Sequence, residues 1–279
     1  MTMKVEEAEF RTLCAKSASR FQLWTEFVRS AQVEAMAEIG VYRGRFAAEM
    51  LAECTSIKKY YLVDPWRHLD DWNKPANTGD ARFATYLAES MANTEFAAHK
   101  RIILRGTTTE VIDQIPDGSL DFAYVDGDHT LRGISVDLIK VYPKIRDGGW
   151  IGGDDFTHMI WQHGDRFEPS LVFPFAVYFA EAVGARIFGL PHLQFLICKP
   201  TRDTGRFEFV DLTGSYSDTA LQAQFRLQSV LRGWVTDTLS RRLLAERMPK
   251  KVRERIRKAG RDQSGFRPRA NRPASNELR

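Results

Sequence analysis

Two short segments of the sequence bring together residue types that could do chemistry. Asp126, Asp128 and His129 lie in the run VDGDHT (125–130), and Asp154 and Asp155 close the run GGDD (152–155). Grouped carboxylates repel each other unless they are protonated, hydrogen-bonded or bound to a cation. Their oxygens suit a hard divalent ion such as Mg²⁺. The pattern predicts a metal site, with Asp126, Asp154 and Asp155 as its ligands.

His129 is predicted to act as a general base beside that metal. The ordinary pKa of a histidine, about 6.5, lets the ring accept a proton at neutral pH. Asp128 competes for the same role, or it orients His129 or serves as an outer ligand. The alternative for the carboxylates is that they are solvated loop acids or helix caps. The choice of base stays open at this point.

The elements that must position these residues follow from the pattern of apolar runs. From residue 36 onward, apolar runs alternate with segments of helical character, which predicts a parallel sheet with helices on both faces. Both acidic runs then lie at the carboxyl ends of strands, where open α/β sheets bind ligands. The expected strands are 36–41, 59–64, 101–106, 120–127, 148–155, 185–190 and 194–199, and the expected helices are 45–54, 82–97, 108–115 and 131–143. The link 191–193 is so short that the last two strands should form an antiparallel hairpin.

The first two strands end in residues suited to a nucleoside-bearing cofactor. EIGVYRG (38–44) has glycines that allow a tight turn and close approach of a ligand, although its spacing is not the GxGxxG dinucleotide motif. Asp64, at the end of the second strand, is placed to bind ribose hydroxyls. An ordinary turn, and a helix cap or surface acid at Asp64, are the alternatives. Thr107 or Thr108 is predicted to cap the following helix, with Glu110 close to capping-box position, and Thr107 could also contact the cofactor.

These motifs resemble those of the class I S-adenosylmethionine (SAM)-dependent methyltransferases. More narrowly, DGDH (126–129) and GGDD (152–155) are similar to the metal-dependent sugar O-methyltransferases of macrolide and aminocoumarin antibiotic pathways. The resemblance covers about residues 35–200. It implies a Rossmann-like sheet of seven strands, mostly parallel, with helices on both faces and one antiparallel hairpin strand. It places His129 at the base position of one subgroup and Asp128 at that of another.

The resemblance also implies a set of cofactor contacts. Gly40 and Gly44 would lie along the methionine and ribose of SAM, and Asp64 would hold the ribose hydroxyls. The full cofactor set is Glu38, Gly40, Tyr42, Gly44, Asp64, Thr107 and Asp126. Asp126, Asp154 and Asp155 match the family's metal positions.

The expected reaction is methylation of a hydroxyl on a small molecule, such as a sugar or another vicinal diol. Mg²⁺ or another divalent metal would lower the pKa of the acceptor hydroxyl, and the base would remove its proton. One rival is a metal-independent SAM methyltransferase acting on another nucleophile. A second rival is a nucleic-acid-associated protein that uses a basic tail, and a third is a non-catalytic scaffold.

The sequence divides into four predicted regions. Residues 1–34 are expected to be an N-terminal helical segment, 35–200 the methyltransferase domain, 201–247 a C-terminal helical extension and 248–279 a basic, disordered tail. Residues 241–279 contain 14 Lys/Arg and 4 Asp/Glu, so the basic character of the chain belongs to its end. Because this end lacks interleaved aromatic residues, nucleic-acid binding is not expected.

Two segments are candidates to shape the acceptor site. Residues 66–78 form either a lid over the cofactor or a packed surface loop, and the aromatic residues of 157–175 either stack on the acceptor or pack on the sheet. The three cysteines, Cys14, Cys54 and Cys198, are widely spaced, which predicts a reducing, cytoplasmic compartment. No apolar run is long enough to span a membrane. The helical segments could mediate homo-oligomerisation.

Overall fold

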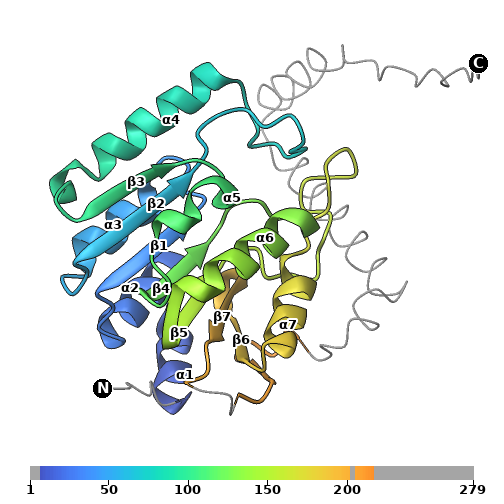
Figure 1. Ribbon diagram of the computed structural model, residues 1–279. Helices are drawn as coiled ribbons and strands as arrows, with labels where there is room; N and C mark the ends of the chain where they lie inside the picture. Colours follow the sequence, from blue (N-terminus) through green and yellow to red (C-terminus); the bar gives the residue numbers. More distant parts are fainter. Residues whose placement is uncertain (1–6, 202–204, 217–279) are drawn as a thin grey trace, which may run out of the picture. The chain divides into compact units, whose positions relative to one another are not determined.

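The computed structural model describes residues 7–201 and 205–216, whose elements are labelled in Figure 1. Within these ranges eight strands form one sheet, in the order β3-β2-β1-β4-β5-β7-β6-β8. The strands are β1 (Ala35–Ile39), β2 (Lys59–Asp64), β3 (Arg101–Arg105), β4 (Leu120–Val125), β5 (Ile145–Gly153), β6 (Arg186–Leu190), β7 (Gln194–Cys198) and β8 (Glu208–Asp211). All neighbouring pairs are parallel except those of β7, which runs antiparallel to both β5 and β6.

The predicted mostly parallel α/β sheet with an antiparallel hairpin strand is therefore confirmed. The hairpin register runs from Arg186 opposite Cys198 to Leu190 opposite Gln194. The expected count of seven strands is wrong, because β8 pairs parallel with β6 as an eighth strand. β8 is four residues long and only Val210 in it is buried, so it has no apolar run to reveal it.

Helices cover both faces of the sheet (Figure 1). The α-helices are α1 (Glu7–Lys16), α2 (Arg20–Ser30), α3 (Arg45–Glu53), α4 (Asp80–Asn93), α5 (Thr108–Val111), α6 (Leu131–Val141) and α7 (Val172–Ala182), and the 3-10 turns are η1 (Glu95–Ala97), η2 (Ile112–Gln114), η3 (Tyr142–Lys144) and η4 (Pro191–Leu193). Buried side chains of α1 to α4 form one hydrophobic cluster, and those of α5 to α7 form a second. Alternate residues of the central strands divide between these clusters, as expected for a sheet buried on both faces.

Helix α7 was not predicted from the sequence. Its residues VFPFAVYFAEA are apolar on almost every side, and seven of the eleven are buried. A helix without a polar face lacks the 3.6-residue period by which an amphipathic helix is recognised. Pro174 lies in its first turn, where a missing N–H breaks no helical hydrogen bond.

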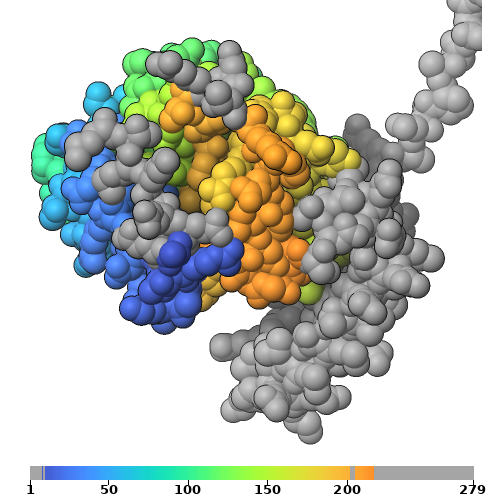
Figure 2. All heavy atoms as spheres, turned by 90° about the horizontal axis from the view of Figure 1, so that it is seen from below, coloured from blue at the N-terminus to red at the C-terminus, as the bar shows by residue number. Residues whose placement is uncertain are grey.

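The N-terminal helices α1 and α2 pack directly against the sheet. Phe10 of α1 packs against Phe188 of β6 with ring centroids 5.6 Å apart, and the His192 ring lies 3.1 Å from Ser17 O. Figure 2 shows these first helical residues in dark blue beside the orange segment of the last strands. Trp24 of α2 is fully buried against Phe122 and Tyr124. The predicted N-terminal helical segment thus contributes directly to the core.

The sheet also continues past the predicted boundary at residue 200. Residues 208–211 fall in the expected helical extension and form β8 instead. The remainder of the expected helical extension, from residue 217 to 247, and the basic tail 248–279 lie outside the described residues. Within the described ranges, no helix has the length and apolar character needed to cross a membrane.

Candidate active site

The turn after β1 lies directly against the end of β4. Gly40, Tyr42 and Gly44 all have positive φ, at 88°, 56° and 69°, so the chain coils tightly here. A Cβ on Gly40 would lie 2.3 Å from the carbonyl oxygen of Asp126. Glycine is therefore required at position 40 both for its φ and for the close approach of two backbones. The predicted cofactor turn and the acidic run after β4 share one edge of the sheet.

Asp64 holds this turn in place. Its Oδ2 accepts hydrogen bonds from the backbone N–H groups of Val41 and Tyr42, both at 2.9 Å, and its Oδ1 accepts one from Trp66 N at 2.8 Å. Burial raises the pKa of Asp64, and the backbone hydrogen bonds partly oppose that rise. The carboxylate expected to bind ribose thus also fixes the shape of the cofactor turn.

Three other predicted cofactor residues, Glu38, Thr107 and Tyr42, differ in how far their side chains are exposed to solvent. Glu38 is almost fully buried and accepts a hydrogen bond from Tyr60 Oη (2.8 Å), and burial raises its pKa well above the ordinary value. Thr107 forms the predicted capping box of α5 with Glu110. Tyr42 is 47% exposed, and its ring lies against Tyr86 with centroids 4.5 Å apart. Glu38 is therefore held inside the protein by the Tyr60 side chain and Thr107 caps a helix, whereas Tyr42 offers a ring at the surface.

His129 lies between two carboxylates. Its Nδ1 forms a close ion pair with Asp155 Oδ2, and its Nε2 lies 3.3 Å from Asp126 Oδ1. Burial lowers the pKa of His129, but Asp126 and Asp155 outweigh that effect and raise it to about 10. The buried Nε2 has no hydrogen bond of good geometry to any described residue, because Asp126 lies out of line. Among the fully buried side-chain atoms of this cluster in the described residues, this nitrogen alone lacks a hydrogen-bond partner.

Arg20 is a member of the cluster that the sequence did not reveal. Its Nη1 lies 3.2 Å from Asp126 Oδ2 and forms a closer ion pair with Asp154 Oδ2. Gln194, also not predicted, donates from Nε2 to Asp154 Oδ1 at 2.5 Å. Arg20 is more than 100 residues away from its partners in sequence, so no local pattern marks it. A polar residue at the start of the apolar strand QFLIC was the available signal for Gln194.

Asp128 points away from this cluster. Its Oδ1 accepts hydrogen bonds from Trp72 Nε1 (3.0 Å) and Thr130 N (2.9 Å), and its Oδ2 accepts one from Thr130 Oγ1 (3.0 Å). A Cβ on Gly133 would lie 2.1 Å from the Asp128 carboxyl carbon, so this side chain packs on the first turn of α6. Of the two candidate bases, only His129 lies among the other carboxylates.

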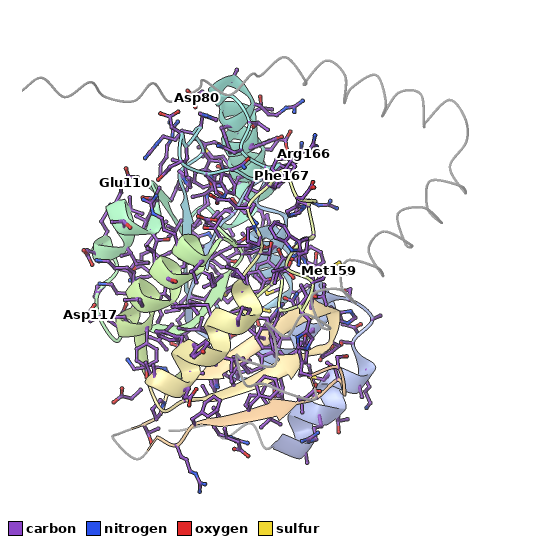
Figure 3. The ribbon with its side chains drawn as sticks, turned by 90° about the vertical axis from the view of Figure 1, so that its right-hand side faces the viewer. Asp80, Glu110, Asp117, Met159, Arg166 and Phe167 are labelled. Atoms are coloured by element: carbon purple, nitrogen blue, oxygen red, sulfur yellow. The ribbon has the colours of Figure 1, made fainter. Side chains whose placement is uncertain are left out.

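Two loops close over this edge of the sheet. Lys74, in the segment 66–78, donates from Nζ to Glu168 O (2.8 Å) and to Ser170 Oγ (3.1 Å). Leu171 N donates to His129 O at 2.8 Å, which ties the second segment to the cluster. In Figure 3, Arg166 and Phe167 mark that second segment. The loop 66–78 is packed here against its neighbour, with Trp66 and Lys74 buried.

The arrangement of the acidic residues does not fit a metal ion. Asp126 and Asp154 both face the guanidinium of Arg20, and Asp155 faces the ring of His129. In residues 7–201 and 205–216 there is no group of three His, Cys, Asp or Glu side chains that could hold a metal. The three aspartates do meet as the sequence indicated, but the expected magnesium site is not supported.

Asp137 beneath the cluster makes a pH-dependent contribution to stability. It accepts a hydrogen bond from Thr108 Oγ1 (2.5 Å), and burial raises its pKa from 3.8 to about 7. Because the folded pKa lies above the unfolded one, folding takes up a proton between these values, and the free energy of unfolding falls as pH rises from about 4 to about 7. We expect Asp137→Asn to remove up to about 4 kcal/mol of that fall.

Urea unfolding at several pH values between 4 and 8 measures this difference. The exposed control Asp70→Asn should give a curve parallel to that of the wild type. A wild type and an Asp137→Asn variant that lose stability in parallel would show that Asp137 stays ionised in the folded protein.

Comparison with known proteins agrees with the fold. Residues 37–156, which run from β1 to just past β5, match a family model described as a methyltransferase domain. No curated protein matches the chain in sequence. The matched range contains the glycine turn, Asp64 and all of the acidic cluster except Arg20 and Gln194, which lie on either side of it.

Solved structures match parts of the chain at TM-scores below 0.5. The O-methyltransferase TomG of Streptomyces achromogenes, involved in tomaymycin synthesis and solved with SAM, is 13% identical, with a TM-score of 0.47 over 72% of this chain and 93% of that one. An O-methyltransferase of Bacillus cereus, in complex with SAH, is 13% identical, with a TM-score of 0.44 over 71% and 84% of the two chains. At these values neither structure bears on the acceptor of this protein.

Proposed function

We propose that this protein, a class I SAM-dependent methyltransferase, methylates a hydroxyl oxygen of a small molecule such as a sugar or another vicinal diol. The sulfonium of SAM supplies the methyl group, and its sulfur keeps the electron pair of the broken bond. The chain's own contribution is to bind the cofactor on the turn after β1 and to hold the acceptor beside His129. A nucleic-acid role would rest on the basic tail, outside the described residues.

One observation carries this proposal. The Gly40 turn touches the backbone of Asp126, so the predicted cofactor site and the His129 cluster are immediate neighbours. A methyl donor bound along that turn and a hydroxyl hydrogen-bonded to His129 Nε2 would be close enough for direct transfer. Holding two reactants in register is the main rate contribution that such a site can make.

The charge of the cluster suits it to accept a proton. Asp126, Asp154 and Asp155 carry three negative charges, and Arg20 and protonated His129 carry two positive ones. The cluster as a whole is therefore left with one negative charge. When the acceptor oxygen forms its bond to the methyl carbon, the hydroxyl proton can pass into this cluster without burying a net positive charge.

His129 is the residue that we place against the acceptor, with Asp128 in a supporting role. The Nε2 of His129 is buried and has no hydrogen-bond partner among the described residues, so an acceptor oxygen that entered the cluster would find a bonding atom there, whereas both oxygens of Asp128 already bind Trp72 and Thr130. Because Asp126 and Asp155 raise the pKa of His129 to about 10, the ring is protonated at neutral pH. To act as the base it must first release the proton on Nε2, and Asp126, whose Oδ1 lies 3.3 Å from that nitrogen, is the carboxylate placed to take it. Nε2 can then accept the hydroxyl proton as the acceptor oxygen bonds to the methyl carbon.

An acceptor screen tests the proposal. Purified protein is incubated with isotopically methyl-labelled SAM and three matched panels of small molecules, carrying vicinal hydroxyls, amines or thiols. We expect label on the hydroxyl panel alone, and mass spectrometry of the products identifies the methylated atom. Transfer to amines or thiols, with hydroxyl compounds untouched, would contradict an oxygen acceptor while leaving the methyltransferase assignment intact.

The sequence also suggested that methyl transfer depends on a divalent metal, and this hypothesis is tested separately. Since the guanidinium of Arg20 already bridges Asp126 and Asp154, we expect EDTA to leave the rate of methyl transfer unchanged within about twofold. Rates are compared in EDTA, in buffer alone and in added Mg²⁺, after the acceptor screen has supplied a substrate. Loss of activity in EDTA and its recovery in Mg²⁺ would restore the metal-dependent mechanism.

A further inference from the structure

Arg20 reaches the acidic cluster from an element that does not belong to the strand ends. It is the first residue of α2, directly after the N-cap Ser19, whose hydroxyl accepts a hydrogen bond from Gln22 N at 3.2 Å. The Arg20 side chain is 33% exposed, and its Nη1 bridges Asp126 and Asp154. A single positively charged nitrogen thus lies where a cation shared by the ends of β4 and β5 would lie.

Helix α2 is fixed in this position by a buried contact one turn further on. Trp24 lies four residues after Arg20, on the same face of the helix. Its Nε1 donates to Gln194 Oε1 at 2.8 Å, and the same oxygen accepts a hydrogen bond from Tyr124 Oη at 2.9 Å. The amide of Gln194 then donates to Asp154 Oδ1. Helix α2 is therefore connected to the Asp154 carboxylate in two ways. One is the ion pair of Arg20, and the other is the hydrogen bond from Trp24 to Gln194, which in turn binds Asp154.

Helix α2 packs closely against β5 at Gly152. A Cβ on Gly152 would lie 2.3 Å from the ring of Trp24. Glycine at this position of β5, two residues before Asp154, allows the indole ring to approach the strand closely. The position of Arg20 is thus set by close packing of the helix and not by its side-chain ion pairs alone.

A divalent ion could enter only by undoing these contacts. Asp154 already binds Arg20 through Oδ2, and binds Gln194 and Asp155 N through Oδ1. Mg²⁺ requires a near-octahedral set of oxygens, so it would have to turn at least Asp126 and Asp154 away from the guanidinium. It would also bring two positive charges close to the charge of Arg20, which repels it.

We propose that Arg20 is the resident cation of this carboxylate cluster and that its guanidinium keeps divalent metal ions out. The inference goes beyond the proposed reaction and does not depend on the identity of the acceptor. It makes α2 part of the active site, because removing the helix would leave Asp126 and Asp154 without their counter-charge. Arg20 is a positioning residue in this account, since it contacts the carboxylates and not the reacting atoms.

Mn²⁺ titration followed by electron paramagnetic resonance tests the proposal, because the signal of free Mn²⁺ falls when the ion binds. The wild type should show no saturable site below about 1 mM Mn²⁺, and Arg20→Ala should gain one site that binds about tenfold more tightly or better. Arg29→Ala is the matched control, since Arg29 lies on the same helix and pairs with Glu53 at the surface. It should behave like the wild type. Adding Asp154→Asn to Arg20→Ala should abolish the new site.

Circular dichroism establishes that each variant is folded before it is titrated. A wild type that binds one Mn²⁺ at micromolar concentration would overturn the proposal without any variant. A folded Arg20→Ala protein that gains no Mn²⁺ site would overturn it as well. Should Arg20→Ala fail to fold, Arg20→Gln, which keeps the length and hydrogen-bonding capacity of the side chain but removes its charge, is titrated against the same two outcomes. Since the readout is metal binding, a failed acceptor screen would leave this result unaffected.

Discussion

His129→Gln is expected to lower kcat by about 100- to 10,000-fold while SAM affinity stays within about twofold of the wild type. Glutamine can keep a hydrogen bond to Asp155, but it cannot gain and lose a proton at neutral pH. The variant therefore removes proton transfer and retains most of the shape of the cluster. Steady-state kinetics on the acceptor found by the screen, together with calorimetric titration of SAM, separates the two effects.

His99→Gln supplies the control for that experiment. His99 is exposed in the turn after η1 and lies outside the acidic cluster, so its substitution should leave both kcat and SAM affinity unchanged. A full rate in His129→Gln would place proton transfer elsewhere, and a matching loss of SAM affinity would show that His129 acts through the cofactor site.

Gly40→Ala is expected to reduce stability by about 3 kcal/mol or more and to abolish measurable SAM binding. The added methyl group would lie 2.3 Å from Asp126 O and 2.5 Å from Gly127 Cα. Both are backbone atoms, so no side-chain rotation relieves the collision. The turn after β1 and the end of β4 would have to separate, which disrupts the cofactor turn and moves Asp126.

Gly118→Ala is the control that separates the two effects of Gly40→Ala, the steric clash of the added Cβ and the strain of a positive φ. Gly118 has a φ of 64°, in the same left-handed region, but a Cβ there would meet nothing within 4 Å. It should cost about 1 kcal/mol in urea unfolding and leave SAM binding intact. Equal losses of stability in the two variants would mean that the contact between Gly40 and Asp126 is looser than the structure indicates.

The N-terminal helices have a larger role than their position in the sequence suggests. They were expected to form a helical segment before the methyltransferase domain, and α2 carries Arg20 into the cluster and Trp24 into the core. This extends the active site beyond the matched range 37–156 on the N-terminal side, and Gln194 extends it on the C-terminal side. Such outlying contacts are where proteins of one fold can differ in chemistry.

The sequence alone determined the parallel core of the fold and the gathering of the acidic residues. Apolar runs of strand length, alternating with helical segments, placed β1 to β7 within a few residues of their observed bounds, apart from the earlier start of β5. Because parallel strands end at one edge, Asp126 after β4 and Asp154 after β5 had to meet. The short link before Gln194 likewise required an antiparallel hairpin.

Only the tertiary structure decided which positive groups balance the negative charges of Asp126, Asp154 and Asp155. Repulsion among three carboxylates requires positive charge nearby, but it does not specify which positive charge. Arg20 arrives through the packing of α2 against β5, and its ion pair with Asp154 joins residues 134 positions apart in the chain. The orientation of Asp128 is set in the same way by Trp72 from a distant loop. Local sequence patterns cannot encode such contacts, because they depend on which helix packs against which strand.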